Sequence, residues 1–129
     1  MSSSPDSPVV ASQARVLVID DNQDITDVIR EHLDELGCAV EVAHDGPAAL
    51  DLAATFSPTV CLLDLSLPSM DGCEVATRLR EAHPGEALKL VAVTGSSGEA
   101  DRVRAREAGF DEHLVKPFDL DDLTRIVST

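Results

Sequence analysis

The chain has 129 residues, of which 43% are hydrophobic, so it is long and apolar enough for one domain with a substantial core. Its ten Lys and Arg residues face 24 Asp and Glu residues, and the formal net charge of -14 disfavours direct binding to nucleic acid or to an anionic membrane surface. The three cysteines have no CxxC spacing and no apolar run approaches the roughly 20 residues of a membrane span, so we expect a cytoplasmic protein.

The first 14 residues are rich in Ser and Pro and are predicted to form a flexible tail or linker, followed by one domain over residues 15–129. A short apolar run at residues 16–19 is typical of a strand buried on both faces. Helical spacing of apolar residues then predicts an amphipathic helix that ends before Gly37. Its apolar residues are Ile25, Val28, Ile29, Leu33 and Leu36.

The alternation of strand and helix repeats four more times. Strands are predicted at about residues 39–43, 60–64, 88–93 and 113–115, and helices at about residues 46–56, 72–82, 99–108 and 119–127. Short strands that alternate with helices of this length predict an α/β fold with an open, doubly wound, five-stranded parallel sheet. A closed eight-stranded barrel would need about twice this length.

Polar residues follow the ends of four predicted strands: Asp20 and Asp21, Asp64, Thr94, and Lys116. Open parallel sheets place their sites outside these carboxyl ends, so we expect the five side chains to converge. Three converging carboxylates repel one another, and a divalent cation that prefers hard oxygen ligands, such as Mg²⁺, would relieve that repulsion. A carboxylate beside such an ion can act as a nucleophile, while a hydroxyl and an ammonium suit phosphoryl oxygens.

The sequence resembles the receiver domains of response regulators in bacterial two-component signalling. The matching segments are residues 16–22, 62–72, 91–95 and 108–118, within a resemblance that extends from about residue 15 to residue 127. The resemblance implies a (βα)5, flavodoxin-like fold with strand order 2-1-3-4-5.

Carried onto this chain, the resemblance makes Asp64 the phosphoacceptor, which takes a phosphoryl group from the phosphohistidine of a histidine kinase or a phosphotransfer protein. Mg²⁺ is then the cofactor, held by Asp20, Asp21, Asp64 and the backbone carbonyl of Ser66. Such a domain is a switch and not an enzyme, apart from its own phosphorylation and a slow loss of the phosphoryl group.

The resemblance also implies the residues of the switch. Thr94 bonds the phosphoryl oxygen and moves toward it, and Lys116 forms a salt bridge to the phosphoryl group ahead of a cis bond to Pro117. His113 stands where the family often carries Tyr or Phe, and we expect it to move together with Thr94. Residues 94–117 look most like receivers attached to hybrid histidine kinases, so a kinase within a longer chain is one expected partner, while a stand-alone receiver also fits. We expect a monomer or a weak dimer.

Two alternatives come from other classes of protein. A phosphorylation-independent interaction module of the same fold remains open because His113 departs from the family pattern. A phosphatase of the haloacid-dehalogenase type is disfavoured, because Ser66 stands where that family needs a second Asp and the acidic pair comes first in the chain. A run of three arginines, Arg102, Arg104 and Arg106, is either a solvated helix face or a partner-docking edge.

Overall fold

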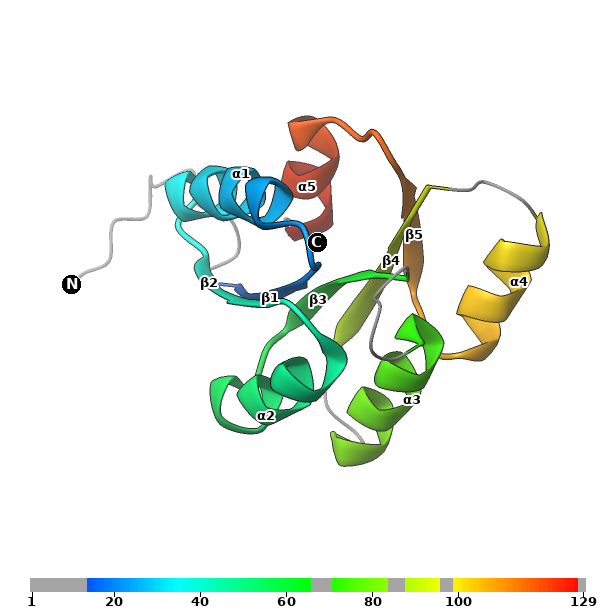
Figure 1. Ribbon diagram of the computed structural model, residues 1–129. Helices are drawn as coiled ribbons and strands as arrows, with labels where there is room; N and C mark the ends of the chain where they lie inside the picture. Colours follow the sequence, from blue (N-terminus) through cyan, green and yellow to red (C-terminus); the bar gives the residue numbers. More distant parts are fainter. Residues whose placement is uncertain (1–13, 66–70, 84–87, 96–98, 128–129) are drawn as a thin grey trace.

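The computed structural model describes residues 14–65, 71–83, 88–95 and 99–127, and within these residues five strands alternate with five helices (Figure 1). The strands are β1 (Arg15–Ile19), β2 (Ala39–Ala43), β3 (Val60–Asp64), β4 (Lys89–Thr94) and β5 (Glu112–Val115). The helices are α1 (Gln23–Glu35), α2 (Gly46–Phe56), α3 (Gly72–Ala82), α4 (Glu99–Glu107) and α5 (Leu120–Val127).

The five strands form one parallel sheet in the order β2-β1-β3-β4-β5, which confirms the predicted fold class and strand order. In Figure 1, α1 and α5 lie on one face of this sheet, and α2, α3 and α4 lie on the other. Because every strand runs in the same direction, the carboxyl ends of β1, β3, β4 and β5 meet at one edge of the sheet.

Two buried apolar clusters hold the helices to the sheet, one on each face. Successive residues of a strand point to opposite faces. Leu17 and Ile19 of β1 therefore belong to the cluster beneath α2, α3 and α4, whereas Val16 and Val18 belong to the cluster beneath α1 and α5. All five residues of β3 are buried, as expected of a central strand covered on both faces.

Short polar side chains cap the N-termini of the helices. Asn22 caps α1, where its side-chain oxygen accepts hydrogen bonds from the backbone N–H groups of Asp24 and Ile25. Asp45 caps α2 in the same way, through the N–H of Ala48. Gly37 follows α1 with a φ of 90°, a backbone conformation that glycine adopts without strain.

The observed ranges of β4 and β5 differ by one residue from the predicted ones. β4 is shifted by one residue, from 88–93 to Lys89–Thr94, whereas β5 begins one residue earlier than predicted, at Glu112, and ends at Val115 as predicted. The backbone carbonyl of Thr94 accepts a 2.8 Å hydrogen bond from the N–H of Lys116, which carries the pairing of the two strands beyond their apolar residues.

Arg80, near the end of α3, ties three segments of the chain together. Its guanidinium donates to the carbonyl oxygens of Leu88 at 2.6 Å and Gly109 at 2.8 Å, and to the carboxylate of Asp111 at 2.6 Å. That carboxylate also accepts a hydrogen bond from the N–H of Leu90. The network fixes the turn between α4 and β5 against α3 and β4, and thereby sets where β5 begins.

Glu112 of β5 makes two ion pairs whose contribution to the stability of the fold can be tested. Its carboxylate lies 3.1 Å from the Lys89 ammonium and 2.5 Å from the Arg125 guanidinium. Burial opposes ionisation of Glu112, but the bonds to Arg125 and Lys89 outweigh it and lower its pKa. A carboxyl group whose pKa is lowered on folding stabilises the folded state at pH values above the ordinary glutamate pKa. This stabilisation is lost as the pH falls through the pKa of the group in the folded state.

Glu112→Gln is therefore expected to lower the free energy of unfolding by about 1 kcal/mol at pH 7, and by progressively less in acid. Urea denaturation between pH 7 and pH 3 measures the difference, with Glu31→Gln on the exposed face of α1 as the control. A difference between native and variant that does not change with pH would show that the ion pairs contribute nothing.

Among the described residues, no helix is long and apolar enough to cross a membrane.

Candidate functional site

The carboxyl edge of the sheet brings together polar side chains that are far apart in the sequence. Asp20 follows β1, Asp64 ends β3, Thr94 ends β4 and Lys116 follows β5. The first three residues are buried, with exposed fractions of 3%, 4% and 7%. Burying such groups is costly unless they are paired, so their collection at one edge points to a binding or reactive site.

Three carboxylates form the acidic part of this site. Asp20, Asp21 and Asp64 each offer an oxygen atom, and these oxygens lie within 4.8 Å of one another. The N–H of Asn22 donates a 2.9 Å hydrogen bond to Asp20 Oδ1, which orients that carboxylate. Asp21 is exposed, so one side of the cluster opens to solvent. Clustered carboxylate oxygens with an open side fit Mg²⁺, which binds through few carboxylates and keeps several waters.

Lys116 lies against two of these carboxylates. Its Nζ is 3.1 Å from Asp64 Oδ2 and 3.4 Å from Asp20 Oδ2. Burial opposes the positive charge of Lys116, but the bond to Asp64 and the charges of Asp64 and Asp20 raise its pKa, so it stays protonated. The peptide bond from Lys116 to Pro117 is cis, as predicted.

The pKa of Asp20 reflects both its burial and the repulsion between the carboxylates of the acidic cluster. Burial raises the pKa of Asp20, and the nearby charge of Asp64 raises it further. The hydrogen bond from Asn22 and the Lys116 ammonium act in the opposite direction without cancelling the increase. The site thus gathers more negative charge than one lysine compensates, which favours a bound cation.

Thr94 lies at the adjacent strand end. In the β3–β4 ladder Asp64 pairs with Val93, and the N–H of Leu65 donates to the Val93 carbonyl at 3.0 Å. Thr94 is the next residue, and it pairs with Val115, the last residue of β5. A buried hydroxyl residue therefore stands between the ends of the strands that carry Asp64 and Lys116.

The other two predicted site residues are His113 and Ser66. His113 lies on β5 opposite Ala92, half-buried, and its buried Nε2 has no hydrogen-bond partner among the described residues. Its movement together with Thr94 stays a prediction. Ser66, whose carbonyl is the fourth predicted protein ligand of Mg²⁺, lies outside the described residues, so that role also stays a prediction.

Gly72 contributes to the site through close packing that spacing alone did not reveal. A Cβ atom at this position would lie 2.9 Å from the Cα of Leu65 and 3.2 Å from the carbonyl oxygen of Asp64. Gly72 follows Asp71, whose side chain caps α3 through the N–H of Cys73. The start of α3 can approach the end of β3 only because this residue lacks a side chain.

Gly72→Ala is expected to displace the end of β3 and to lower the free energy of unfolding by about 1–3 kcal/mol. Gly95→Ala is the control, because a Cβ atom there meets nothing within 4 Å. Urea denaturation of both variants measures the difference. Equal effects of the two substitutions would mean that the close contact at Gly72 relaxes without cost.

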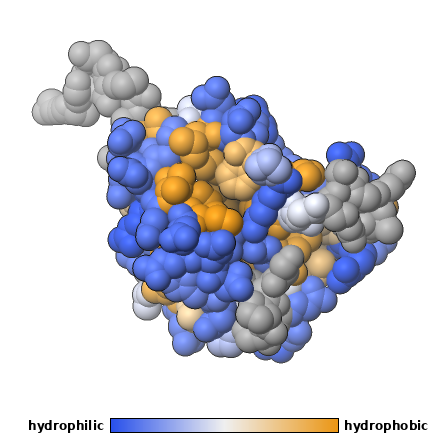
Figure 2. Space-filling view, turned by 45° about the horizontal axis from the view of Figure 1, so that its top comes forward, coloured by the Kyte–Doolittle hydropathy of each residue, from blue (hydrophilic) through white to orange (hydrophobic). Residues whose placement is uncertain are grey.

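An apolar groove of about 480 Å³ lies beside the acidic cluster. It is lined by Ile25, Val28, Ile29, Lys116, Pro117, Phe118 and Leu120. Figure 2 shows apolar surface gathered in a hollow on the side of the molecule where α1 and α5 lie. Val28 belongs to the predicted apolar stripe of α1, but it is 53% exposed and lines this groove.

A family model described as the response regulator receiver domain matches residues 16–128. The response regulator MprA of Mycobacterium avium is 38% identical over 109 residues, which are 84% of this chain and 47% of that protein. The chain thus spans about half the length of the MprA relatives that it matches.

Solved structures agree with this assignment. A CheY-like receiver domain protein from Methanospirillum hungatei has a TM-score of 0.82 at 29% identity, over 90% of this chain and 91% of that chain. A response regulator from Burkholderia pseudomallei, solved with a phosphorylated aspartic acid, a calcium ion and citrate, has a TM-score of 0.82 at 28% identity, over 91% of this chain and 68% of that chain. From its sequence, its fold and these similarities, the chain belongs to the response regulator receiver domain family.

Proposed function

We propose that this receiver domain accepts a phosphoryl group on Asp64 from the phosphohistidine of a histidine kinase or a phosphotransfer protein, in a reaction that depends on Mg²⁺. The observation that carries the proposal is the position of the buried Asp64 carboxylate, 3.1 Å from the Lys116 ammonium and clustered with Asp20 and Asp21. The phosphorylated aspartic acid and calcium ion of the Burkholderia pseudomallei relative support it.

In this reaction an Asp64 carboxylate oxygen attacks the phosphorus atom. A P–O bond forms, the P–N bond to the donor imidazole breaks, and its electron pair stays on the departing ring nitrogen. Mg²⁺, held by Asp20, Asp21, Asp64 and the Ser66 carbonyl, would neutralise negative charge between the carboxylates and the phosphoryl oxygens. Lys116 binds one phosphoryl oxygen and Thr94 donates its hydroxyl to another.

Formation of the aspartyl phosphate then changes the surface that partners contact. Thr94 moves toward the phosphoryl oxygen, and the space it leaves allows His113 to turn inward from the β5 surface. The phosphoryl group thereby shifts an equilibrium between two packings of α4 and β5. Attachment of this receiver to a hybrid kinase and a location in the cytoplasm remain predictions of the same account.

Two other functions follow from the same fold with less support. An interaction module that needs no phosphorylation would have no use for a buried, lysine-paired Asp64. A phosphatase of the haloacid-dehalogenase type would need an acid–base residue where this chain has Ser66. A hydroxyl at this position cannot replace a carboxylic acid as proton donor to the leaving group.

Transfer from a protein donor tests the proposal. A phosphotransfer protein carrying ³²P on histidine is mixed with the chain and Mg²⁺, and the label on each protein is followed after electrophoresis. The label is expected on the native chain but not on Asp64→Asn, and excess EDTA should prevent the transfer. Label that reaches Asp64→Asn as well would overturn the assignment of Asp64.

The apolar groove beside Lys116 suggests where the donor protein binds. Lys116 both lines the groove and bonds Asp64, so a protein that brings a phosphohistidine to Asp64 would also cover the groove. Burial of Val28, now 53% exposed, would then contribute to the affinity of the complex.

Val28→Ser is therefore expected to slow transfer from the protein donor about tenfold while leaving phosphorylation by acetyl phosphate unchanged, since the small donor needs no docking surface. Val103→Ser on α4 is the control, because Val103 is also an exposed helical valine, at 39%. Equal rates for the two variants with the protein donor would place the docking surface elsewhere.

A further inference from the structure

We propose that residues 8–10 of this chain occupy the apolar groove between α1 and α5. The segment reads Pro8-Val9-Val10 and precedes the described residues. The groove is then a binding site for a segment of the same chain, and its occupancy does not depend on phosphorylation of Asp64. Only the functional consequence, competition with a donor protein for the groove, rests on the proposed function.

The α1–α5 groove exposes large apolar side chains to water. Its volume is about 480 Å³, and apart from Lys116 every residue that lines it is apolar. Val28 and Leu120 both line it, with exposed fractions of 53% and 41%. Among the described residues, the only other exposed large hydrophobic side chain is that of Val103. Two such side chains at one hollow favour an occupant that removes them from water (Figure 2).

The chain enters the domain on the same face of the sheet as the groove. Ala14, the first described residue, packs against the apolar cluster beneath α1 and α5. Its carbonyl accepts a 3.1 Å hydrogen bond from the N–H of Ala39. Ala39 follows closely after Leu36, the residue that caps the end of α1. The residues before Ala14 therefore leave the domain beside the end of α1.

A short stretch of chain is enough to reach the groove from this point. Along the axis of α1, Val28 lies about 12 Å from Leu36, at 1.5 Å per residue. An extended chain spans about 3.3 Å per residue, so Val10 can lie up to about 13 Å and Val9 up to about 17 Å from Ala14. Both valines can therefore reach the near end of the groove while the segment stays connected to β1.

The charge of the segment also suits the surroundings of the groove. Three exposed acids, Asp24, Asp27 and Asp119, are next in sequence to residues that line it. Residues 1–13 contain a single acid, Asp6, and no Lys or Arg. The rest of the chain carries nearly all of its 24 acids, so the domain surface of a second copy would be repelled more strongly by this rim. The segment before Ala14 is therefore the favoured occupant.

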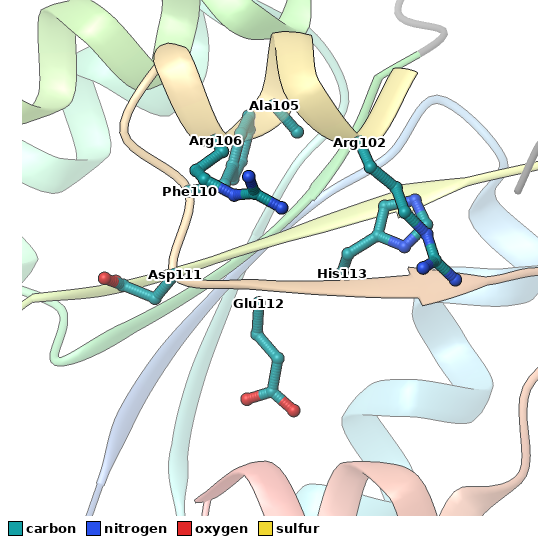
Figure 3. Close-up of a pocket in the computed structure, with 7 residues that line it drawn as sticks. All are labelled: Arg102, Ala105, Arg106, Phe110, Asp111, Glu112 and His113. Atoms are coloured by element: carbon teal, nitrogen blue, oxygen red, sulfur yellow. The ribbon is translucent and has the colours of Figure 1, made fainter. Parts of the chain in front are cut away.

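The larger groove, between α4 and β5, matches this segment poorly. Its volume is about 600 Å³, and its lining includes Arg102, Arg106, Asp111 and Glu112. Figure 3 shows these charged side chains among the residues that line it. Covering charged groups with aliphatic side chains removes hydration without supplying a bond in return. The α1–α5 groove is therefore the site that we assign to residues 8–10.

The covalent connection to β1 makes weak binding sufficient. A short tether holds the segment at an effective concentration on the order of 1 mM. A segment with an intrinsic dissociation constant of about 0.5 mM would then occupy the groove about two thirds of the time. Two or three apolar side chains buried in a groove are enough for an affinity of this order. The groove is therefore covered for much of the time but not permanently.

Occupancy by the segment would slow the proposed transfer reaction. A donor protein that docks on the groove must displace the segment, so its apparent affinity falls with the fraction of molecules whose groove is open. With the groove open in about one third of the molecules, the double variant Val9→Ser/Val10→Ser should speed transfer from the protein donor about threefold. Phosphorylation by acetyl phosphate should not change, because this small donor needs no docking surface.

NMR of the ¹³C,¹⁵N-labelled full chain, unphosphorylated and without Mg²⁺, tests the occupancy directly. Methyl–methyl NOEs are expected from Val9 or Val10 to Val28 and Leu120. The double variant Val9→Ser/Val10→Ser should shift the amide signals of the groove residues. Val28→Ser should lower the ¹⁵N heteronuclear NOE of Val9 and Val10, because the segment is then released more often. Val103→Ser, at the exposed valine outside the groove, is the control and should change none of these signals.

The absence of these NOEs, with groove amides that do not shift in the double variant, would overturn the proposal. NOEs from Val9 and Val10 to a different surface would overturn it too. NOEs that appear between a labelled and an unlabelled copy, and that vanish on dilution, would make the segment of a second copy the occupant. If the NOEs are present but the double variant receives the phosphoryl group at the native rate, the segment occupies the groove and the donor docks elsewhere. That result would contradict the docking surface in the proposed function and leave the occupancy intact.

Discussion

Asp20→Asn is expected to stabilise the protein in the absence of Mg²⁺ and to remove most of its response to Mg²⁺. Burial and the charge of Asp64 raise the pKa of Asp20 in the folded state. A carboxyl group whose pKa is higher in the folded state than in the unfolded state opposes folding when it is ionised. Any stabilisation that the protonated group provides below the unfolded-state pKa is therefore lost as the pH rises through the folded-state pKa. At pH 7 the neutral amide should therefore raise the free energy of unfolding by about 1 kcal/mol.

The same substitution removes an anionic ligand of the cation. Mg²⁺ stabilises a protein that binds it only in the folded state, by an amount that grows with the logarithm of its concentration. Thermal unfolding with and without 10 mM Mg²⁺ should show a clear increase in Tm for the native chain and little increase for Asp20→Asn. Asp27→Asn, at an exposed position of α1, should behave like the native chain in both conditions. A variant that is less stable without Mg²⁺ would contradict the electrostatic account of the cluster.

Lys116→Met is expected to destabilise the protein in the absence of Mg²⁺ and to increase its affinity for Mg²⁺. Both effects are opposite to those expected for Asp20→Asn. The ammonium bonds both Asp64 and Asp20, and its removal leaves two buried carboxylates without their cation. The free energy of unfolding without Mg²⁺ should fall by about 2 kcal/mol at pH 7. Affinity for Mg²⁺ should rise, because the ion no longer competes with an ammonium for the same oxygens. The rate of aspartyl phosphate formation should fall about tenfold or more, because one donor to the phosphoryl oxygens is lost.

Lys89→Met is the matched control, since Lys89 is the only other lysine in the chain. It makes an ion pair with Glu112 far from the carboxylate cluster, so its loss should lower stability without changing the response to Mg²⁺. Urea denaturation over a series of Mg²⁺ concentrations measures the free energy of unfolding and the affinity for Mg²⁺ of both variants. A fall in Mg²⁺ affinity in Lys116→Met would show that the lysine assists the cation instead of competing with it.

Much of the site could be predicted because parallel strands end at one edge of a sheet. Buried strands are visible as short apolar runs, so the residues that follow them are placed by topology alone. Asp20, Asp64, Thr94 and Lys116 were found in this way, and the structure places them at one edge. The family resemblance supplied the strand order and the roles of these residues, which periodicity does not determine.

Other features could not be predicted because they depend on distances between separate segments. The apolar stripe of α1 has a single helical period, yet Ile29 is buried whereas Val28 is exposed at the groove. The arginines of α4 look alike in sequence, but Arg104 pairs with Asp71 while Arg102 lines the α4–β5 groove. Which carboxylate each side chain meets is decided by the packing of α3 and β5 beside α4.

The most direct test of the central claim is the intact mass of the chain after incubation with acetyl phosphate and Mg²⁺. The native chain is expected to gain one phosphoryl group, about 80 Da, as an aspartyl phosphate. The adduct should be absent without Mg²⁺ and absent in Asp64→Asn. An adduct that persists in Asp64→Asn, or a native chain that neither gains mass nor consumes the donor, would contradict phosphorylation at Asp64.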